Sequence, residues 1–443
     1  MTALGWTAAE VATIVAGRLV GESRLIDRVV VDSRRAVPGA LFVALPGTRT
    51  DGHLHASEAV ERGGVALVAA GRGVSVEPRI EVGDPLTALR DLAAAHRANL
   101  DLPTVGITGS TGKTSTKALL AAALPGAVVA PRSYNNEIGV PLTVLAAHGD
   151  ATGLVLEVGS RGRGHIRWLL PAVRPDVAVI TNLGLVHLET FGTEADLADA
   201  KWELAEGVGP DGTVVVPVDE PRLRRAHPGR VVTFGASARA DVAYSSVRLD
   251  EELRPRFRLH VGGETREVLV GLRGAHQAAN AAAAVAAALA LGRELDDVVG
   301  GLAEVTAPRW RMELRRGRYL VVNDAYNANP DSVAAALEAV THLPGRRIAV
   351  LGTMAELGAV AEREHRRIGA LAAELGYRWL VAVGATHGMA EAAGDIAVEA
   401  ADADEAYTIL RGLLRPGDVV LVKGSRAAGL EGLADRLAEE ADA

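Results

Sequence analysis

The segment from Thr104 to Thr116 constrains the fold of this 443-residue chain most strongly, and it reads TVGITGSTGKTST. An apolar run enters a glycine-rich turn, and Gly112-Lys113-Thr114 then opens a helix, which is the repeating unit of a parallel α/β sheet. Glycines let backbone N–H groups close around a phosphate, and the helix N-terminus adds positive potential. We therefore predict a phosphate-binding loop made of Gly109, Ser110, Thr111, Gly112, Lys113, Thr114 and Ser115.

The strict phosphate-loop pattern needs glycine five residues before Gly112, where this chain has Ile107. A plain glycine turn followed by a coincidental Lys-Thr therefore remains an alternative at this point. In the phosphate-loop interpretation, Lys113 neutralises phosphate oxygens and the Thr114 hydroxyl binds Mg²⁺.

The chain is too long for one ordinary domain, and the pattern of apolar runs predicts three α/β domains. We place a small N-terminal domain at 1–101, a central parallel-sheet phosphate-loop domain at 102–310 and a C-terminal Rossmann-like domain at 311–443. The expected strands are Val29–Asp32, Leu41–Ala44, Ala66–Ala69, Thr104–Thr108, Gly153–Val158, Asp176–Thr181, Thr213–Pro217, Tyr319–Asn323, Arg347–Leu351, Trp379–Val383 and Asp418–Val422. Helices are expected at Ser57–Arg62, at Pro85–Asn99 and after His276, and an antiparallel hairpin within Leu253–Val270.

Composition excludes several classes of protein. The net charge of −8 argues against general binding to nucleic acid or to an anionic membrane, because both need a basic surface. The absence of cysteine excludes disulfides and thiolate chemistry. We recognise no signal peptide, and the most apolar stretch, Ala278 to Leu291, is too short to span a membrane. We expect a cytoplasmic protein with no membrane insertion.

Two further side chains are expected beside the phosphate loop. Glu157 ends one predicted strand, and His187 follows the next one along the chain. Ligands of open parallel sheets bind beyond the carboxyl ends of the strands, so both side chains should face the phosphates. Together with Thr114 they offer oxygen and nitrogen ligands for Mg²⁺.

Lys201 is one of only four lysines in the chain, with Lys113, Lys117 and Lys423. It shares an apolar helical stripe with Leu197 and Leu204, in a helix that begins near Thr193. A buried lysine has a lowered pKa, and its neutral amine can add CO₂ to become a carbamate that binds Mg²⁺. The alternative is a lysine whose stem packs while its ammonium reaches water.

These features closely resemble the Mur ligases of peptidoglycan synthesis, and within them the branch that adds D-alanyl-D-alanine. The matching segments span nearly the whole chain. They are Asp32-Ser33-Arg34, GALFVAL from Gly39, Asp51-Gly52-His53, GITGSTGKTSTK, YNNEIGVPLT from Tyr134, Glu157, TNLGLVHLETFG from Thr181, AKWE from Ala200, GAHQAANAAAA from Gly274, WRMEL from Trp310, NDAYNANPDS from Asn323, VLGTMAELG from Val350 and KGSR from Lys423.

The resemblance implies an ATP-dependent amide ligase that works through an acyl phosphate, with Mg²⁺ at two sites and a carbamate on Lys201. Its catalytic residues would be Lys113, Lys201, His187, Glu157 and Arg311, and its metal ligands Thr114, Glu157, His187 and Lys201. Nucleotide contacts would extend to His276, Asn280, Arg311, Asp324, Asn327 and Asn329. The substrate site would include Asp32, Ser33, Arg34, Phe42, Val43, Ala44, Asn135, Asn136 and Lys423. The implied substrates are UDP-N-acetylmuramoyl-tripeptide, whose UDP-sugar end the N-terminal domain would bind, and D-alanyl-D-alanine; we expect a monomer.

The chain departs from the family pattern at Thr111, where Asn is common, at Gln277, at Ser160-Arg161 and at Thr353, which replaces an Asp. Another Mur ligase and a folylpolyglutamate synthetase-like ligase remain alternatives. So does an inactive nucleotide-binding homologue, although every predicted metal position is present.

Overall fold

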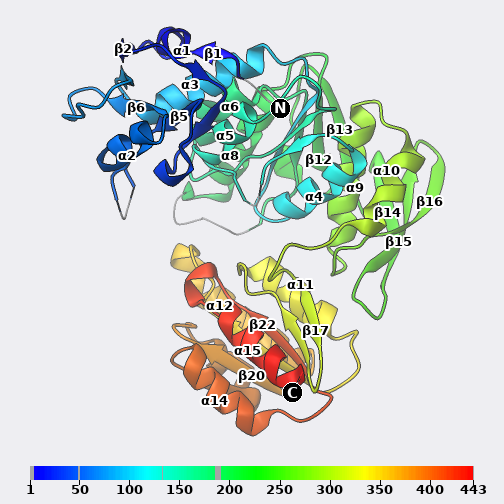
Figure 1. The fold of residues 1–443 in the computed structure, drawn as a ribbon. Helices are drawn as coiled ribbons and strands as arrows, with labels where there is room; N and C mark the ends of the chain where they lie inside the picture. Colours follow the sequence, from blue (N-terminus) through cyan, green and yellow to red (C-terminus); the bar gives the residue numbers. More distant parts are fainter. Residues whose placement is uncertain (1–3, 48–49, 132, 185–190, 443) are drawn as a thin grey trace.

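The computed structural model describes residues 4–47, 50–131, 133–184 and 191–442, and it contains three large sheets (Figure 1). The predicted three-part α/β architecture is therefore confirmed. The strands predicted from the sequence are present, with ends displaced by at most two residues. Helix α1 (Ala8–Ile14) begins with a capping box formed by Thr7 and Glu10.

The N-terminal part is built on a five-stranded sheet in the order β2-β7-β6-β5-β4. Strands β4 to β7 are parallel, and β2 runs antiparallel to β7. Its elements are β1 (Trp6–Thr7), α1 (Ala8–Ile14), β2 (Arg18–Val20), β3 (Leu25–Ile26), β4 (Arg28–Val30), β5 (Ala40–Val43), α2 (Ala56–Glu61), β6 (Val65–Ala69), β7 (Arg79–Val82) and α3 (Pro85–Ala98).

The central part holds a nine-stranded sheet in the order β16-β15-β14-β13-β12-β11-β8-β10-β9. Strands β8 to β14 are parallel, and β15 and β16 extend the sheet as the predicted antiparallel hairpin. The strands are β8 (Thr104–Thr108), β9 (Val128–Val129), β10 (Leu154–Glu157), β11 (Val177–Ile180), β12 (Thr213–Pro217), β13 (Arg230–Gly235), β14 (Val242–Leu249), β15 (Pro255–Val261) and β16 (Glu264–Leu269). The helices are α4 (Lys113–Ala123), α5 (Gly139–Leu145), α6 (His165–Val173), α8 (Glu194–Glu206), α9 (Gln277–Ala290) and α10 (Leu295–Gly301).

The C-terminal part is a six-stranded sheet in the order β17-β18-β22-β19-β20-β21, parallel except for β17. Its elements are β17 (Glu313–Arg316), β18 (Leu320–Asn323), α11 (Pro330–Val340), β19 (Arg347–Gly352), α12 (Ala361–Glu374), β20 (Trp379–Val383), α13 (Met389–Ala393), β21 (Ala397–Ala400), α14 (Ala403–Leu413), β22 (Val419–Lys423) and α15 (Glu431–Asp442). Across the three parts, strands β1, β2, β3, β7, β9, β13, β14, β17 and β21 were not predicted from the sequence.

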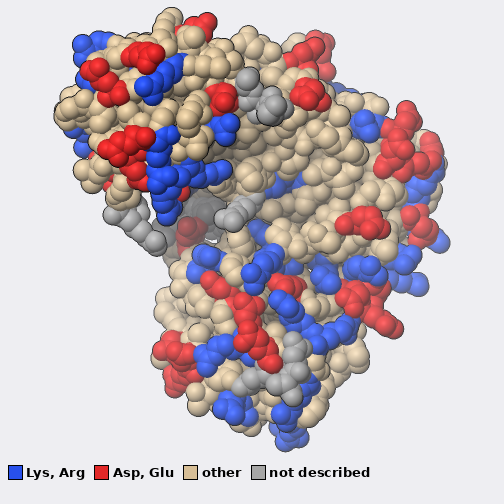
Figure 2. Space-filling model, in the orientation of Figure 1, with Lys and Arg blue, Asp and Glu red and all other residues tan. Residues whose placement is uncertain are grey.

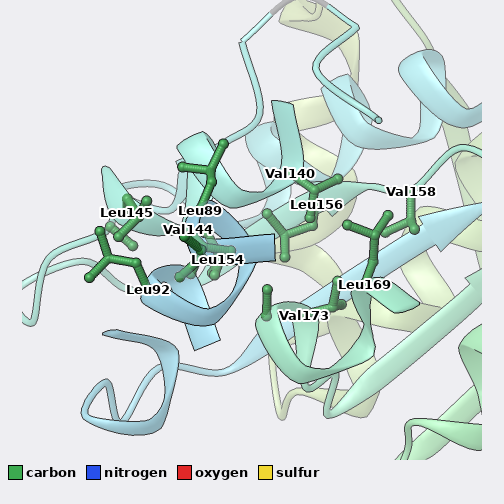
Figure 3. Close-up of a cluster of buried hydrophobic side chains, with 14 of the residues drawn as sticks. Leu89, Leu92, Val140, Val144, Leu145, Leu154, Leu156, Val158, Leu169 and Val173 are labelled. Carbon is green, nitrogen blue, oxygen red and sulfur yellow. The ribbon is translucent and has the colours of Figure 1, made fainter. Parts of the chain in front are cut away.

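The N-terminal and central parts share one hydrophobic core. Helix α3 packs against α5 and α6, so that Leu89 and Leu92 meet Val144 and Leu169 in a single cluster (Figure 3). The opposite face of the central sheet is covered by α4, α9 and α10. Among the helices that the structure describes, none has the length and apolar composition to cross a membrane.

Candidate active site

The predicted phosphate loop connects β8 to α4, and its two glycines are required by their surroundings. Gly109 has φ +144°, and a Cβ there would lie 2.0 Å from Thr181 Oγ1. Gly112 has φ +79°, and a Cβ there would lie 2.3 Å from Asn280 Oδ1. Any side chain at either position would therefore deform the loop. The Lys113 ammonium folds back over the loop and donates to the carbonyl oxygens of Gly109 at 2.6 Å and Ser110 at 3.1 Å.

The segment after β11 holds this loop in place. The Thr181 hydroxyl donates to the Thr111 carbonyl oxygen at 2.5 Å, and the Thr111 amide donates to Asn182 Oδ1 at 2.9 Å. The Asn182 amide also donates to the Thr111 hydroxyl, so the unusual Thr111 is integrated into the loop. The Ser110 hydroxyl donates to the Gly184 carbonyl oxygen at 3.1 Å. Predicted site residue His187 lies a few positions further on, outside the described residues.

Glu157 lies at the carboxyl end of β10, is 1% exposed and has three partners. Its Oε2 accepts from the Thr114 hydroxyl at 3.1 Å and lies 3.1 Å from the Lys117 ammonium, while Oε1 accepts from the Asn135 amide at 2.9 Å. The predicted magnesium ligands Thr114 and Glu157 are thus in direct contact. Lys117 was noted in the sequence as a rare lysine but was given no role; its place one turn after Lys113 was the available signal.

Lys201 is 1% exposed, with Leu197 and Leu204 buried beside it as the helical spacing predicted. The ammonium does not reach water, so the alternative of a solvent-reaching lysine is wrong. Burial, together with the nearby Lys113 charge, lowers the pKa of Lys201 well below its ordinary value. Within the described residues no carboxylate lies at ion-pair distance from its Nζ, and the Phe191 ring centroid is 5.7 Å away.

The start of α9 contributes a small polar group beside the loop. The Asn280 amide donates to Gln277 Oε1 at 2.8 Å, and Gln277 Nε2 lies 3.0 Å from His276 Nε2. Burial lowers the pKa of His276, which favours the neutral imidazole. Gln277, one of the departures from the family pattern, therefore connects the two predicted nucleotide contacts.

The C-terminal part brings Arg311 to the phosphate loop. Its guanidinium lies 3.4 Å from the Thr114 hydroxyl and is stacked on the Tyr326 ring, 4.1 Å from the centroid. The Tyr326 hydroxyl in turn lies 2.8 Å from the Ser133 hydroxyl of the central part. Tyr326 and Ser133 were missed as site residues, although both lie in or beside segments that carried the family resemblance.

Asp324 and Lys423 form a pair on the C-terminal sheet, 2.6 Å apart, and Lys423 also donates to the Asn327 carbonyl oxygen at 2.9 Å. Asn329 caps helix α11 by accepting from the Ser332 amide. Thr353 donates to the Ala385 carbonyl oxygen at 3.1 Å, so its hydroxyl holds a neighbouring loop.

The predicted substrate residues of the N-terminal part divide into two sets. Hydrogen bonds from the Arg34 side chain lower the pKa of Asp32 to about 2, and the Ser33 hydroxyl donates to Glu58 at 2.8 Å. The side chains of Phe42, Val43 and Ala44 lie in the core, so these residues can offer a ligand only their main chain.

Asn136 Oδ1 accepts from the backbone amide of Gly139, the first residue of α5, at 2.8 Å, and the neighbouring Asn135 reaches Glu157. Figure 2 shows a hollow where the C-terminal part meets the rest of the molecule, with Lys and Arg side chains along its rim.

The described residues include no cluster of three or more His, Asp or Glu side chains that could hold a metal by itself. Thr114 and Glu157 instead present two convergent oxygens, and the buried amine of Lys201 belongs to the same region through its interaction with Lys113. An additional oxygen on that amine would suit a hard cation such as Mg²⁺.

Comparisons with known proteins give a consistent result along the chain. Residues 25–97 match the model of the Mur ligase family catalytic domain, residues 107–288 the Mur ligase middle domain, and residues 310–426 the Mur ligase glutamate ligase domain. The chain is 41% identical to UDP-N-acetylmuramoyl-tripeptide–D-alanyl-D-alanine ligase of Mycobacterium tuberculosis, over 97% of each chain.

Solved structures are similar over the same length. MurF from Acinetobacter baumannii superposes with a TM-score of 0.91 at 30% identity, covering 99% of this chain and 100% of that one. MurF ligase from Thermotoga maritima in complex with ADP superposes with a TM-score of 0.84 at 28% identity, covering 93% of this chain and 97% of that one.

Proposed function

Because the chain belongs to the Mur ligase family, we propose that it joins D-alanyl-D-alanine to UDP-N-acetylmuramoyl-tripeptide and converts ATP to ADP and phosphate in the process. The observation that carries this proposal is the 41% identity to a ligase of that name over 97% of both chains, which leaves none of the three parts unmatched. The ADP complex of the Thermotoga maritima relative supports ATP as the nucleotide.

In the first step, the substrate carboxylate attacks the γ-phosphorus of ATP and ADP leaves. Lys113 lies over the phosphate loop and Arg311 lies beside Thr114, which supports a role for both cations in neutralising the charge on the transferred phosphoryl group. The neutral His276 and Asn280 would contact the nucleotide from the start of α9.

Two groups that complete this chemistry are proposed from the donors present. Thr114 and Glu157 would hold Mg²⁺, together with His187 and a carbamate on Lys201, and two ions would occupy the site. The fit rests on the contact between the Thr114 and Glu157 oxygens and on the buried amine of Lys201 with its lowered pKa. When bound, Mg²⁺ supplies Lewis-acid polarisation of the phosphoryl oxygens.

In the second step, the amine of the dipeptide attacks the acyl carbon, the tetrahedral intermediate collapses and phosphate leaves. Water would destroy the acyl phosphate, so the amine must be delivered to a site from which solvent is excluded. Docking of the C-terminal part against the phosphate loop would provide that exclusion.

For the three domains we propose the boundaries 1–101, 102–310 and 311–443.

We also propose the remaining assignments. The UDP-sugar end would bind at Asp32, Ser33, Arg34 and the main chain of Phe42 to Ala44, with Asn135, Asn136 and Lys423 near the peptide end. Asp324, Asn327 and Asn329 would approach the nucleotide. A cytoplasmic location suits a reaction that consumes ATP and a UDP-linked substrate, and we propose that the protein is a monomer.

The test is release of phosphate from ATP with UDP-N-acetylmuramoyl-tripeptide, with and without D-alanyl-D-alanine. We expect release that depends on both substrates and a product whose mass equals that of the two joined less one water. Turnover with a single amino acid or with a folate substrate, and none with the dipeptide, would overturn the proposed substrate. The protein would then still be an ATP-dependent ligase, but one with a different amine or acyl substrate.

A further inference from the structure

Arg311 is presented to the phosphate loop by an unusual stretch of backbone. Its neighbours Trp310 and Met312 have φ +62° and +51°, in the left-handed region that residues other than glycine rarely adopt. The Trp310 carbonyl oxygen accepts from the Tyr326 amide at 3.1 Å, and the Met312 amide donates to Asp324 Oδ1 at 3.1 Å. The segment between β18 and α11 therefore holds this backbone in place.

Tyr326 adds two side-chain contacts that point in different directions. Its ring lies under the Arg311 guanidinium at 4.1 Å, and its hydroxyl lies 2.8 Å from the Ser133 hydroxyl of the central part. Ser133 is two residues from Asn135, whose amide donates to Glu157, and Glu157 accepts from the same Thr114 hydroxyl that Arg311 approaches. These contacts form a closed circuit across the boundary between the central and C-terminal parts.

We propose that Tyr326 is a positioning residue that docks the C-terminal part on Ser133 and thereby holds Arg311 at the phosphate loop. The circuit couples the 133–136 segment, near the proposed acyl substrate, to the arginine that assists phosphoryl transfer. This inference rests on the proposed function for its catalytic consequence, and on the Arg311–Tyr326 and Tyr326–Ser133 contacts for its structural one.

Tyr326 is well suited to a test because it lies outside the hydrophobic clusters formed by the described residues. Its replacement should therefore spare the fold. Tyr326→Phe removes only the hydroxyl contact, Tyr326→Leu also removes the stacked ring, and Ser133→Ala removes the same hydroxyl contact from the other side. Tyr319→Phe is the matched control, because Tyr319 lies in the C-terminal core cluster away from this boundary.

We expect Tyr326→Phe and Ser133→Ala each to lower kcat roughly 3- to 10-fold, the size of one hydrogen bond, with the KM for ATP nearly unchanged. The kcat of the double variant should be no lower than that of either single variant, because both substitutions remove the same hydrogen bond. Tyr326→Leu should fall about 5-fold further, and Tyr319→Phe should behave as the parent. In an Arg311→Ala background, Tyr326→Leu should have little additional effect.

Two results would overturn the inference. One is a decrease of kcat in the Tyr326→Phe/Ser133→Ala variant that equals the product of the two single decreases. The other is a decrease of kcat by Tyr326→Leu that is as large in the Arg311→Ala background as in the parent. Hydrogen exchange of residues 133–139 provides a readout that needs no substrate, and Tyr326→Phe should speed it. If the chain shows no turnover with the proposed substrates, unchanged exchange in Tyr326→Phe would still reject the docking role.

Discussion

Two buried lysines next to the phosphate loop have opposite surroundings. Lys117 is 5% exposed and forms an ion pair with Glu157, whereas Lys201 is 1% exposed and has no carboxylate at ion-pair distance among the described residues. Glu203, a buried acid two residues after Lys201, instead accepts from the backbone amides of Gly164 and Arg167. Burial with a partner keeps a lysine charged, and burial without one favours the neutral amine.

The neutral amine makes Lys201 testable. Lys201→Arg should abolish activity, because a guanidinium stays protonated and does not add CO₂, and Lys201→Ala should be partly rescued by short carboxylates such as acetate. Only the neutral amine adds CO₂, and its pKa is lowered, so the carbamate should persist at neutral pH and decline as the pH falls through that lowered pKa. Activity assays test the variants, and ¹³C NMR of protein equilibrated with ¹³CO₂ follows the carbamate as the pH changes. Full activity of Lys201→Arg would contradict a catalytic role for the carbamate.

The Lys117–Glu157 pair leads to a prediction about stability. Lys117→Met leaves a buried carboxylate without its cation and should lower the free energy of unfolding by about 3–5 kcal/mol. Adding Glu157→Gln removes the uncompensated charge and should recover much of that loss, as measured by urea denaturation. If the double variant were less stable than Lys117→Met, the pair would not be the source of the effect.

At the scale of elements, the site depends on how closely helices approach the central strands. A Cβ on Gly106 of β8 would lie 3.0 Å from a Leu204 methyl group, so the absence of a side chain there lets α8 lie against the strand that leads into the phosphate loop. This contact places Lys201, one turn earlier on α8, in the region of Lys113. The β11 segment and the start of α9 then fix the loop from two further sides.

The same packing predicts that Gly112 is irreplaceable. Gly112→Ala would put a Cβ 2.3 Å from Asn280 Oδ1, and the alanine would have to adopt the left-handed φ of this position. The affinity for ATP should therefore fall at least about 10-fold. Gly292→Ala is the control, because Gly292 also has a left-handed φ of +74° but has no neighbour within 4 Å of the added Cβ. It should lose only about 1 kcal/mol of stability and bind ATP normally in calorimetry. Equal loss of affinity in both variants would contradict the steric explanation.

For the molecule as a whole, the two junctions between its parts differ in how much apolar packing and how much polar contact they contain. The N-terminal and central parts share an apolar core, and Arg97 adds hydrogen bonds to carbonyl oxygens of Val173 and Arg174 across the junction. The central and C-terminal parts share a smaller apolar contact, where Leu253 packs in the C-terminal core, and near the phosphate loop they meet through the polar contacts of Arg311 and Tyr326. Apolar cores resist separation, whereas polar interfaces open and close at small free-energy differences.

We therefore expect the C-terminal part to move while the other two remain one unit. The chain has no cysteine, so paired cysteines can be introduced at exposed Glu61, Asp211 and Glu374 for spin labels. When ATP and the acyl substrate bind, the distribution of distances between labels at positions 211 and 374 should shift and become narrower. The distribution between labels at positions 61 and 211 should stay the same. Identical Asp211–Glu374 distance distributions with and without ligands would count against closure.

Features that depend on neighbours along the chain could be predicted without the fold. The phosphate loop, the strands that enter it and the buried stripe that carries Lys201 follow from local spacing, since a helical or extended period places side chains on one face whatever packs there. The branch of the family could also be recognised, because its motifs are short continuous segments.

Which of these segments meet depends on the packing of the whole chain, and it became known from the fold. The Asn135–Glu157 bond joins residues 22 positions apart, and the Ser133–Tyr326 contact joins residues 193 apart. Nothing in a local period specifies such a partner, because it depends on how the sheets and their covering helices pack. The partners of Glu157 and the docking of Arg311 on Tyr326 therefore emerged from the fold, while the residues that take part were already visible in the chain.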